Sequence, residues 1–109
     1  MSGRVCYLVL VFVRPGQEEL LREYERRARP IMRRHGGDFE RVMKPVARGG
    51  EASGPHEVHL LHFDSAGAFD AFRSDPELQR YTALRDAAVE RAELLTLTDI
   101  ALPEYFGTS

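Results

Sequence analysis

The spacing of apolar and polar positions along the chain predicts alternating strands and helices. Residues 5–13, "VCYLVLVFV", form an unbroken apolar run that is typical of a central strand covered on both faces. Residues 17–35 place apolar side chains three and four positions apart, which predicts an amphipathic helix. Pro30 lies inside this pattern and predicts a kink, and the glycines at 36–37 predict the end of the helix.

The second half of the chain repeats the same two element types. Residues 38–46 alternate polar and apolar positions as an edge strand does, and residues 56–63, "HEVHLLHF", are a short apolar strand. Residues 65–93 show helical spacing in two pieces, and residues 94–100 alternate again as a half-buried strand. The predicted order of elements is therefore β-α-β-β-α-β.

This order is that of the ferredoxin-like α+β fold. Right-handed crossovers place the first and third strands in the centre of a four-stranded antiparallel sheet, with the helices on one face. We expect a single domain over residues 1–109, with a core at about 5–100 and a C-terminal tail at 101–109. Because the first strand directs apolar side chains to both faces of the sheet, the face without helices must also be covered. A second copy of the chain is the simplest cover, which predicts a homodimer joined sheet to sheet.

Charge and cysteine content narrow the expected partners and compartment. A net charge of -2 and a pI near 6.1 argue against binding to nucleic acid or to an anionic membrane. The single cysteine, Cys6, cannot form an internal disulfide and is typical of a reducing compartment. The apolar run at 5–13 is too short to cross a bilayer as a helix. We therefore expect a cytoplasmic protein.

Beyond the first strand, three stretches resemble a known family in their order and spacing. They are "YERRARPIMRRHGGDFERV" (24–42), "VHLLHFDSAGAFDAF" (58–72) and "SDPELQRYTALRDAAV" (74–89). Together with the final strand they resemble the dimeric α/β-barrel superfamily, and within it the domain-of-unknown-function family 1330. The resemblance implies the ferredoxin-like fold and a sheet-to-sheet dimer. Superfamily relatives include cofactor-independent monooxygenases, isomerases, haem-degrading enzymes and proteins without known activity.

Two departures from those relatives affect the expected chemistry. The chain has no tryptophan and no recognisable Asn/Trp/His set of the haem-degrading relatives, so we expect no cofactor. In the family pattern an acidic residue often precedes the phenylalanine that ends the third strand, and here that position is His62.

Three of the four histidines fall within residues 56–63, which raises the question of a metal site. In a strand His59 points away from His56 and His62, and these two are roughly 20 Å apart, too far to share one ion. We therefore predict no metal. His59 shares a strand face with Glu57, whose carboxylate could orient the imidazole as a general base. The alternative is a hydrogen-bonded histidine of the core.

Five other residues are candidates for a site between helices and sheet. Tyr24 and Arg41 are candidate catalytic partners of His59, and we expect Arg41 on the strand face that carries Phe39 and Met43. The candidate ligand-binding residues are Tyr81, Arg85 and His62. The structural alternative is core packing for the tyrosines and, similarly, for Arg85 on the second helical stripe, and a surface position on an edge strand for Arg41.

These candidates predict a protein that binds a small molecule. If it is an enzyme, we expect cofactor-independent proton abstraction, isomerisation or oxygenation at an acidic carbon of a small carbonyl or aromatic compound. His59 would be the base, and Tyr24, Tyr81 or Arg41 would stabilise the anion. The alternative is a non-catalytic ligand-binding or structural dimer. The sequence leaves both the substrate and catalysis itself open.

Overall fold

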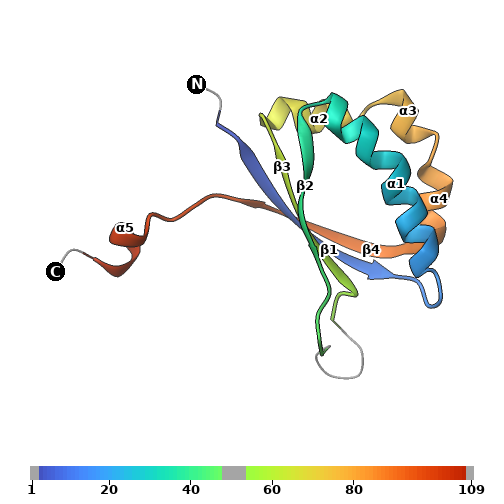
Figure 1. The fold of residues 1–109 in the computed structure, drawn as a ribbon, viewed down its shortest axis with the longest axis horizontal. Coiled ribbons are helices and arrows are strands. Elements are labelled where there is room, and N and C mark those ends of the chain that lie inside the picture. Colours follow the sequence, from blue (N-terminus) through green and yellow to red (C-terminus); the bar gives the residue numbers. More distant parts are fainter. Residues whose placement is uncertain (1–2, 48–53, 108–109) are drawn as a thin grey trace.

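The computed structural model describes residues 3–47 and 54–107, which form one four-stranded antiparallel sheet and its helices (Figure 1). The sheet order is β2-β3-β1-β4, which confirms the predicted ferredoxin-like topology with the first and third strands in the centre. The elements are β1 (Val5–Val13), α1 (Glu18–Arg34), β2 (Gly37–Met43), β3 (Glu57–Phe63), α2 (Ala66–Arg73), α3 (Pro76–Gln79), α4 (Thr82–Ala88), β4 (Val89–Leu97) and α5 (Leu102–Phe106).

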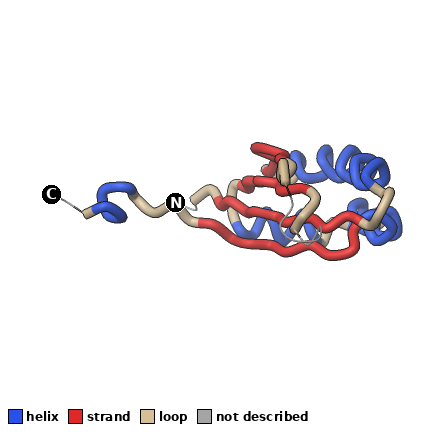
Figure 2. The backbone as a smooth tube through the Cα atoms, turned by 90° about the horizontal axis from the view of Figure 1, so that it is seen from below, coloured by secondary structure: helices blue, strands red, loops and turns tan. Residues whose placement is uncertain are grey.

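The helices α1 to α4 cover one face of the sheet, and the main core lies between the two layers (Figures 1 and 2). Aromatic side chains dominate this core. Phe63 is 0% exposed, and Tyr7 stacks on Phe69 with ring centroids 4.0 Å apart. The rings of Phe63 and Phe72 lie 5.5 Å apart. Because aromatic side chains bury large areas, this cluster anchors the helices on the sheet.

Helix α1 forms because its apolar stripe meets the sheet and its end charges match the helix dipole. Acidic residues occupy its first turn and arginines its last. The helix continues through Pro30 and ends before Gly36, whose φ of +77° lies in the left-handed region that favours glycine. At Gly37 an added Cβ would lie 2.3 Å from the ring of Phe63, so only glycine fits there without rearrangement.

The boundary between the last helix and the last strand differs from the prediction. Helical spacing predicted a helix to residue 93, but α4 ends at Ala88 and β4 begins at Val89. Val89 pairs with Val13, and Leu94 with Val9, along the central strand β1. Hydrogen bonding to β1 thus outweighs the local helical pattern. The strand also ends at Leu97, before the predicted residue 100.

A β-bulge in β2 changes the predicted face of Arg41. The pairing with β3 shifts register between Phe39 and Arg41, so that Phe39 pairs with Leu61 and Arg41 with Leu60. One additional residue reverses the parity of all later side chains in a strand. Arg41 therefore lies on the face opposite Phe39, and the prediction that they share a face is wrong.

The sheet face away from α1 to α4 carries mainly apolar side chains, and we call it the open face. Pairing along β1 places on it the polar residues His62, Arg91 and Glu93 and the following apolar ones: Cys6, Leu8, Leu10, Phe12, Val58, Leu60, Leu95 and Leu97. Leu95 is 48% exposed and Leu97 is 39% exposed. Within residues 3–47 and 54–107 no helix packs against this face (Figure 1).

Beyond β4 the chain extends away from the body of the domain as an arm, residues 98–107, that includes the short helix α5 (Figure 2). Ile100, Leu102, Tyr105 and Phe106 of the arm are between 62% and 76% exposed. Among the described residues, no helix is long and apolar enough to span a membrane.

Candidate functional site

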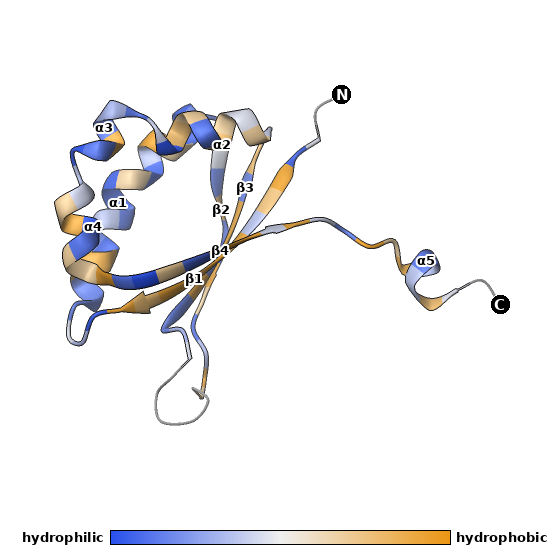
Figure 3. Ribbon diagram, turned by 180° about the vertical axis from the view of Figure 1, so that it is seen from behind, coloured by the Kyte–Doolittle hydropathy of each residue, from blue (hydrophilic) through white to orange (hydrophobic). Residues whose placement is uncertain are grey.

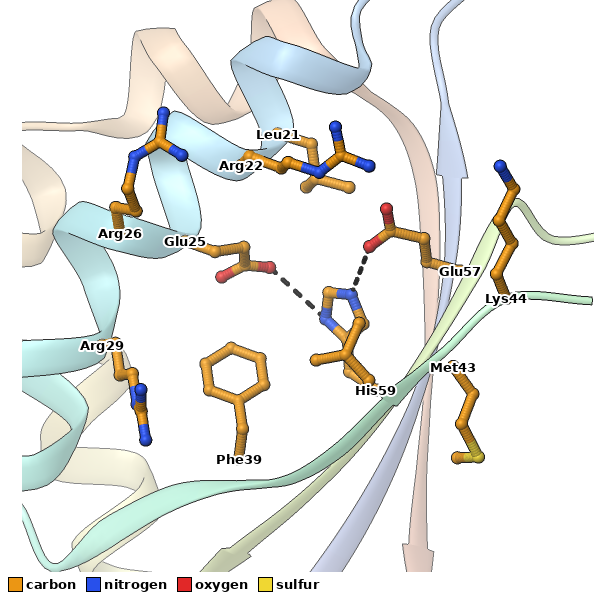
Figure 4. Close-up of a pocket in the computed structure, with 11 residues that line it drawn as sticks. Leu21, Arg22, Glu25, Arg26, Arg29, Phe39, Met43, Lys44, Glu57 and His59 are labelled. Atoms are coloured by element: carbon orange, nitrogen blue, oxygen red, sulfur yellow. Dashed lines mark hydrogen bonds and ion pairs between the residues drawn. The ribbon is translucent and has the colours of Figure 1, made fainter.

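His59 lies near the middle of β3, and its side chain faces α1, where two carboxylates meet it (Figure 4). Its Nε2 is 2.8 Å from Oε1 of Glu57, two residues earlier on the same strand face. Its Nδ1 is 3.4 Å from Oε2 of Glu25 on α1. The His59 side chain is only 4% exposed. We call these three residues the carboxylate–histidine cluster.

The two carboxyl groups of this cluster differ in pKa because their surroundings differ. Burial raises the pKa of Glu25 to about 7, although the nearby His59 favours its ionised form. The hydrogen bond with His59 lowers the pKa of Glu57 below its usual value. Near neutral pH Glu57 is therefore ionised, whereas Glu25 is present in both its protonated and its ionised form. Two carboxyl groups with separated pKa values are a common basis for acid–base chemistry.

A pocket of about 510 Å³ opens beside the cluster, between α1 and the strands β2 and β3 (Figure 4). Glu25, Glu57 and His59 form one part of its lining. The rest of the lining consists of four apolar residues, Leu21, Phe39, Val42 and Met43, and four cationic ones, Arg22, Arg26, Arg29 and Lys44. The cluster is therefore open to a small molecule and is not sealed inside the core.

A smaller cavity of about 100 Å³ lies on the inner side of the cluster. It shares Glu25 and His59 with the outer pocket, and its lining also includes Tyr24 and Arg85. Burial raises the pKa of Tyr24 to about 12, so the phenol stays protonated and can donate a hydrogen bond at neutral pH. Tyr24 and Arg85 also line a third cavity, of about 410 Å³, on the side of α4 and β4.

The structure brings together three of the predicted site residues, His59, Tyr24 and Arg85, around the inner cavity. Tyr81 packs against the main core cluster and lines none of these three cavities. The bulge places Arg41 on the opposite sheet face, where it is exposed.

His62 also lies apart from the cluster, on the open face, with its Nδ1 3.2 Å from Oε1 of Glu40. His59 is both buried and hydrogen-bonded, as the core alternative predicted, and it borders a pocket as the catalytic prediction requires. The described part of the chain holds no group of three His, Cys, Asp or Glu side chains suited to a metal ion.

Glu25 is the site residue that the sequence analysis missed. It falls on the buried stripe of α1 formed by Leu21, Ala28 and Met32, at spacings of four and three residues. A carboxylate on an otherwise apolar helical stripe is costly unless it has a partner. The position of Glu25 on this stripe therefore marks it as a candidate site residue from the sequence alone. The sequence prediction names the adjacent Tyr24 and overlooks Glu25.

The sheet order and helix placement define a ferredoxin-like α+β protein. The pattern of the family described as "Domain of unknown function (DUF1330)" matches residues 6–98, and the chain belongs to that family. No curated protein matches the chain.

Several solved structures have a similar fold. A protein of unknown function from Rhodopseudomonas palustris, RPA0582, has a TM-score of 0.79 and 24% identity over 92% of this chain and 85% of its own. A dabb family protein with a ferredoxin-like fold from Mesorhizobium loti has a TM-score of 0.66 and 13% identity over 92% and 100%. An uncharacterised NIPSNAP-like domain protein from Burkholderia xenovorans has a TM-score of 0.64 and 16% identity over 94% and 90%. At these identities the likeness concerns the fold alone.

Proposed function

We propose that this protein is a cofactor-independent enzyme that transfers protons on a small carbonyl compound. The observation that carries the proposal is the buried His59, which has a carboxylate at each ring nitrogen and borders a pocket. A general base works best when its pKa lies near the operating pH, and the pKa of Glu25 is about 7. Because both nitrogens of His59 face carboxylates, the base in this proposal is Glu25, and His59 positions it.

The proposed step needs no additional reactant. The Glu25 carboxylate takes a proton from the carbon next to a carbonyl group, and the C–H electron pair moves to form an enolate. The protonated phenol of Tyr24, in the adjoining inner cavity, is available to donate a hydrogen bond to the enolate oxygen. Delivery of a solvent-derived proton to the same carbon gives exchange, and delivery to a different carbon of a conjugated enolate gives isomerisation.

Exchange of C–H for deuterium in D2O, followed by proton NMR, tests this proposal on a panel of small ketones and oxo acids. We expect Glu25→Gln to slow catalysed exchange by about 100-fold or more, because the base is removed. Glu18→Gln, an exposed first-turn residue of the same helix, is the matched control and should leave the rate unchanged. If the wild type binds panel members but catalyses no exchange, the non-catalytic binding alternative replaces this proposal.

We further propose that two copies of the chain pair through their open faces. The support is the apolar strip along β1, β3 and β4, in which Leu95 and Leu97 are 48% and 39% exposed (Figure 3). Several charged side chains beside this strip are paired within one chain, as in Arg4–Glu40 and Arg91–Glu93, whereas Arg41 on the edge strand β2 has no ion pair among the described residues. A second copy would therefore meet a mainly apolar surface with few unpaired charges.

Size-exclusion chromatography with light scattering tests the proposed dimer. We expect a dimer for the wild type and a monomer for Leu95→Glu, which places a charge in the apolar strip. The matched control is Leu94→Glu, because Leu94 is similarly exposed at 41% but pairs with Val9 on the helix-covered side. A wild-type monomer at high concentration, or equal effects of the two variants, would contradict the proposal.

A further inference from the structure

The lining of the outer pocket is more positive than the rest of the molecule. It contains four cationic and two acidic side chains, whereas the whole chain has a net charge of -2. Arg22, Arg26 and Arg29 come from α1, and Lys44 follows β2 on the other side of the pocket (Figure 4). Cations concentrated at the mouth of a pocket raise the local concentration of anionic ligands.

The four cations differ in how far they are already engaged. Arg29 donates two hydrogen bonds to Asp38, at 2.9 and 3.2 Å, so its positive charge is already paired with a carboxylate. Arg22 donates one hydrogen bond to Glu19, at 2.7 Å, which leaves other N–H donors free for a ligand.

The other two cations are less engaged. Nε of Arg26 is 3.7 Å from Glu23, a carboxylate that it shares with Arg27. Lys44 has no ion pair among residues 3–47 and 54–107. We call Arg22, Arg26 and Lys44 the cationic rim.

The acidic residues of the pocket do not neutralise this rim. Glu57 is hydrogen-bonded to His59, and Arg22 and Lys44 lie on either side of it (Figure 4). Glu57 carries one negative charge, which His59 already stabilises through a hydrogen bond, whereas Arg22 and Lys44 together carry two positive charges. Glu25 lines the inner cavity as well as the outer pocket and contacts His59. The rim therefore has charge available for a ligand.

We infer that the pocket takes a small oxo acid, whose carboxylate binds the cationic rim while its carbonyl end lies toward Glu25 and the inner cavity. This inference rests on the proposed proton transfer, and it names the substrate class. The guanidinium group of Arg22 can pair with a carboxylate in the forked geometry that arginine favours. Phe39 and Val42 provide an apolar wall for the carbon chain between the two ends. A neutral ketone of the same size would leave the rim without a partner.

In the chemical step the proton passes from the carbon next to the carbonyl to Glu25, and the electron pair moves onto the carbonyl oxygen. In D2O a deuteron from the solvent replaces that proton, so the exchange is balanced without an additional reactant.

A matched pair of probes, acetoacetate and methyl acetoacetate, tests the inference, because they share a skeleton and differ in the negative charge. Binding is measured by NMR titration, and exchange at C2 is measured in D2O. We expect the wild type to bind acetoacetate about tenfold more tightly than the ester, because one charge-assisted pair contributes about that factor. The double variant Arg22→Gln/Lys44→Gln should lose this preference and bind the ester as the wild type does.

The control variant is Arg80→Gln, which removes a positive charge at an exposed position outside the pocket and should keep the preference. Equal binding of the two probes, no binding of acetoacetate, or an unchanged preference in the double variant would overturn the inference. If exchange depends on Glu25 but the two probes bind equally well, the proposed function stands and the inference fails. If acetoacetate binding depends on the rim but no exchange occurs, the ligand class stands and the proposed proton transfer fails.

Discussion

His59 and His62 lie three residues apart on β3, on opposite faces of the sheet, and they differ in burial and in charge environment. The side chain of His59 is 4% exposed and meets two carboxylates at the floor of a pocket. The side chain of His62 is 23% exposed and lies beside Glu40, which also pairs with Arg4. The same residue type in the same strand is thus part of a candidate site on one face and of a surface ion cluster on the other.

The two faces also differ in how their apolar residues are covered. On the helix-covered face Phe63 is 0% exposed and lies among three other aromatic rings. On the open face Leu95 is 48% exposed. Burial within one chain therefore stabilises the fold through the helix-covered face, whereas the open face has apolar area available for a partner. The following predictions test this difference, from the largest expected effect to the smallest.

Alanine substitutions on the two faces should separate folding from assembly. We expect Phe63→Ala to lower the free energy of unfolding by about 3–5 kcal/mol, because it leaves a cavity among Tyr7, Phe69 and Phe72. Leu95→Ala should cost less than about 1 kcal/mol in dilute solution and more as the concentration rises. Urea denaturation at several protein concentrations measures both. A concentration-independent loss of similar size for Leu95→Ala would remove the distinction.

The partly buried carboxyl of Glu25 should make stability depend on pH. Its pKa is 4.5 in an ordinary environment and about 7 in the folded chain, so between these values the folded state holds a proton that the unfolded state releases. The contribution of Glu25 to the free energy of unfolding therefore falls as pH rises through this window. At pH 8, Glu25→Gln should be more stable than the wild type by about 1–3 kcal/mol, and at pH 4 the two should be equal.

Urea denaturation at both pH values measures this effect, with Glu18→Gln as the control. A constant difference between Glu25→Gln and the wild type at all pH values would show that Glu25 does not titrate in this window. Loss of catalysed exchange together with a gain in stability is the pattern expected of a residue retained for function.

At one end of the open face, a side chain of the same chain covers an apolar residue. Removing that side chain should lower the free energy of unfolding by less than Phe63→Ala does. The guanidinium carbon of Arg91 lies 3.8 Å from the ring centroid of Phe12, which is 8% exposed. We expect Arg91→Ala to lower the free energy of unfolding by about 0.5–1 kcal/mol, because it removes a cation–π contact. Arg91→Lys should retain part of the contact. A loss above that range would mean that Arg91 also holds β4 against β1.

His62→Gln should have the smallest effect. We expect a change within about 0.5 kcal/mol in the free energy of unfolding and no change in exchange rate, because His62 is partly exposed and lies away from the pocket. His59→Gln, measured in parallel, should slow the exchange. If both substitutions slow it equally, the assignment of the site to the helix-covered face is wrong.

Much of the fold follows from local patterns in the sequence. The apolar run at 5–13 coincides with β1, and the stripe over 17–35 corresponds to α1 at Glu18–Arg34. The sheet order follows from right-handed crossovers and needs no knowledge of individual contacts. The end of α4 could not be predicted in this way, because residues 89–93 become a strand through pairing with β1.

For the candidate site, the sequence by itself determined that His59 and Glu57 share a strand face, because side chains alternate along a strand. The strand spacing also predicts that the histidines at positions 56, 59 and 62 are too far apart to share one metal ion. Only the tertiary structure decided that Glu25 completes the cluster, since helix and strand meet through packing between distant segments. The β-bulge that turns Arg41 away is likewise a property of strand pairing, which no local pattern reveals.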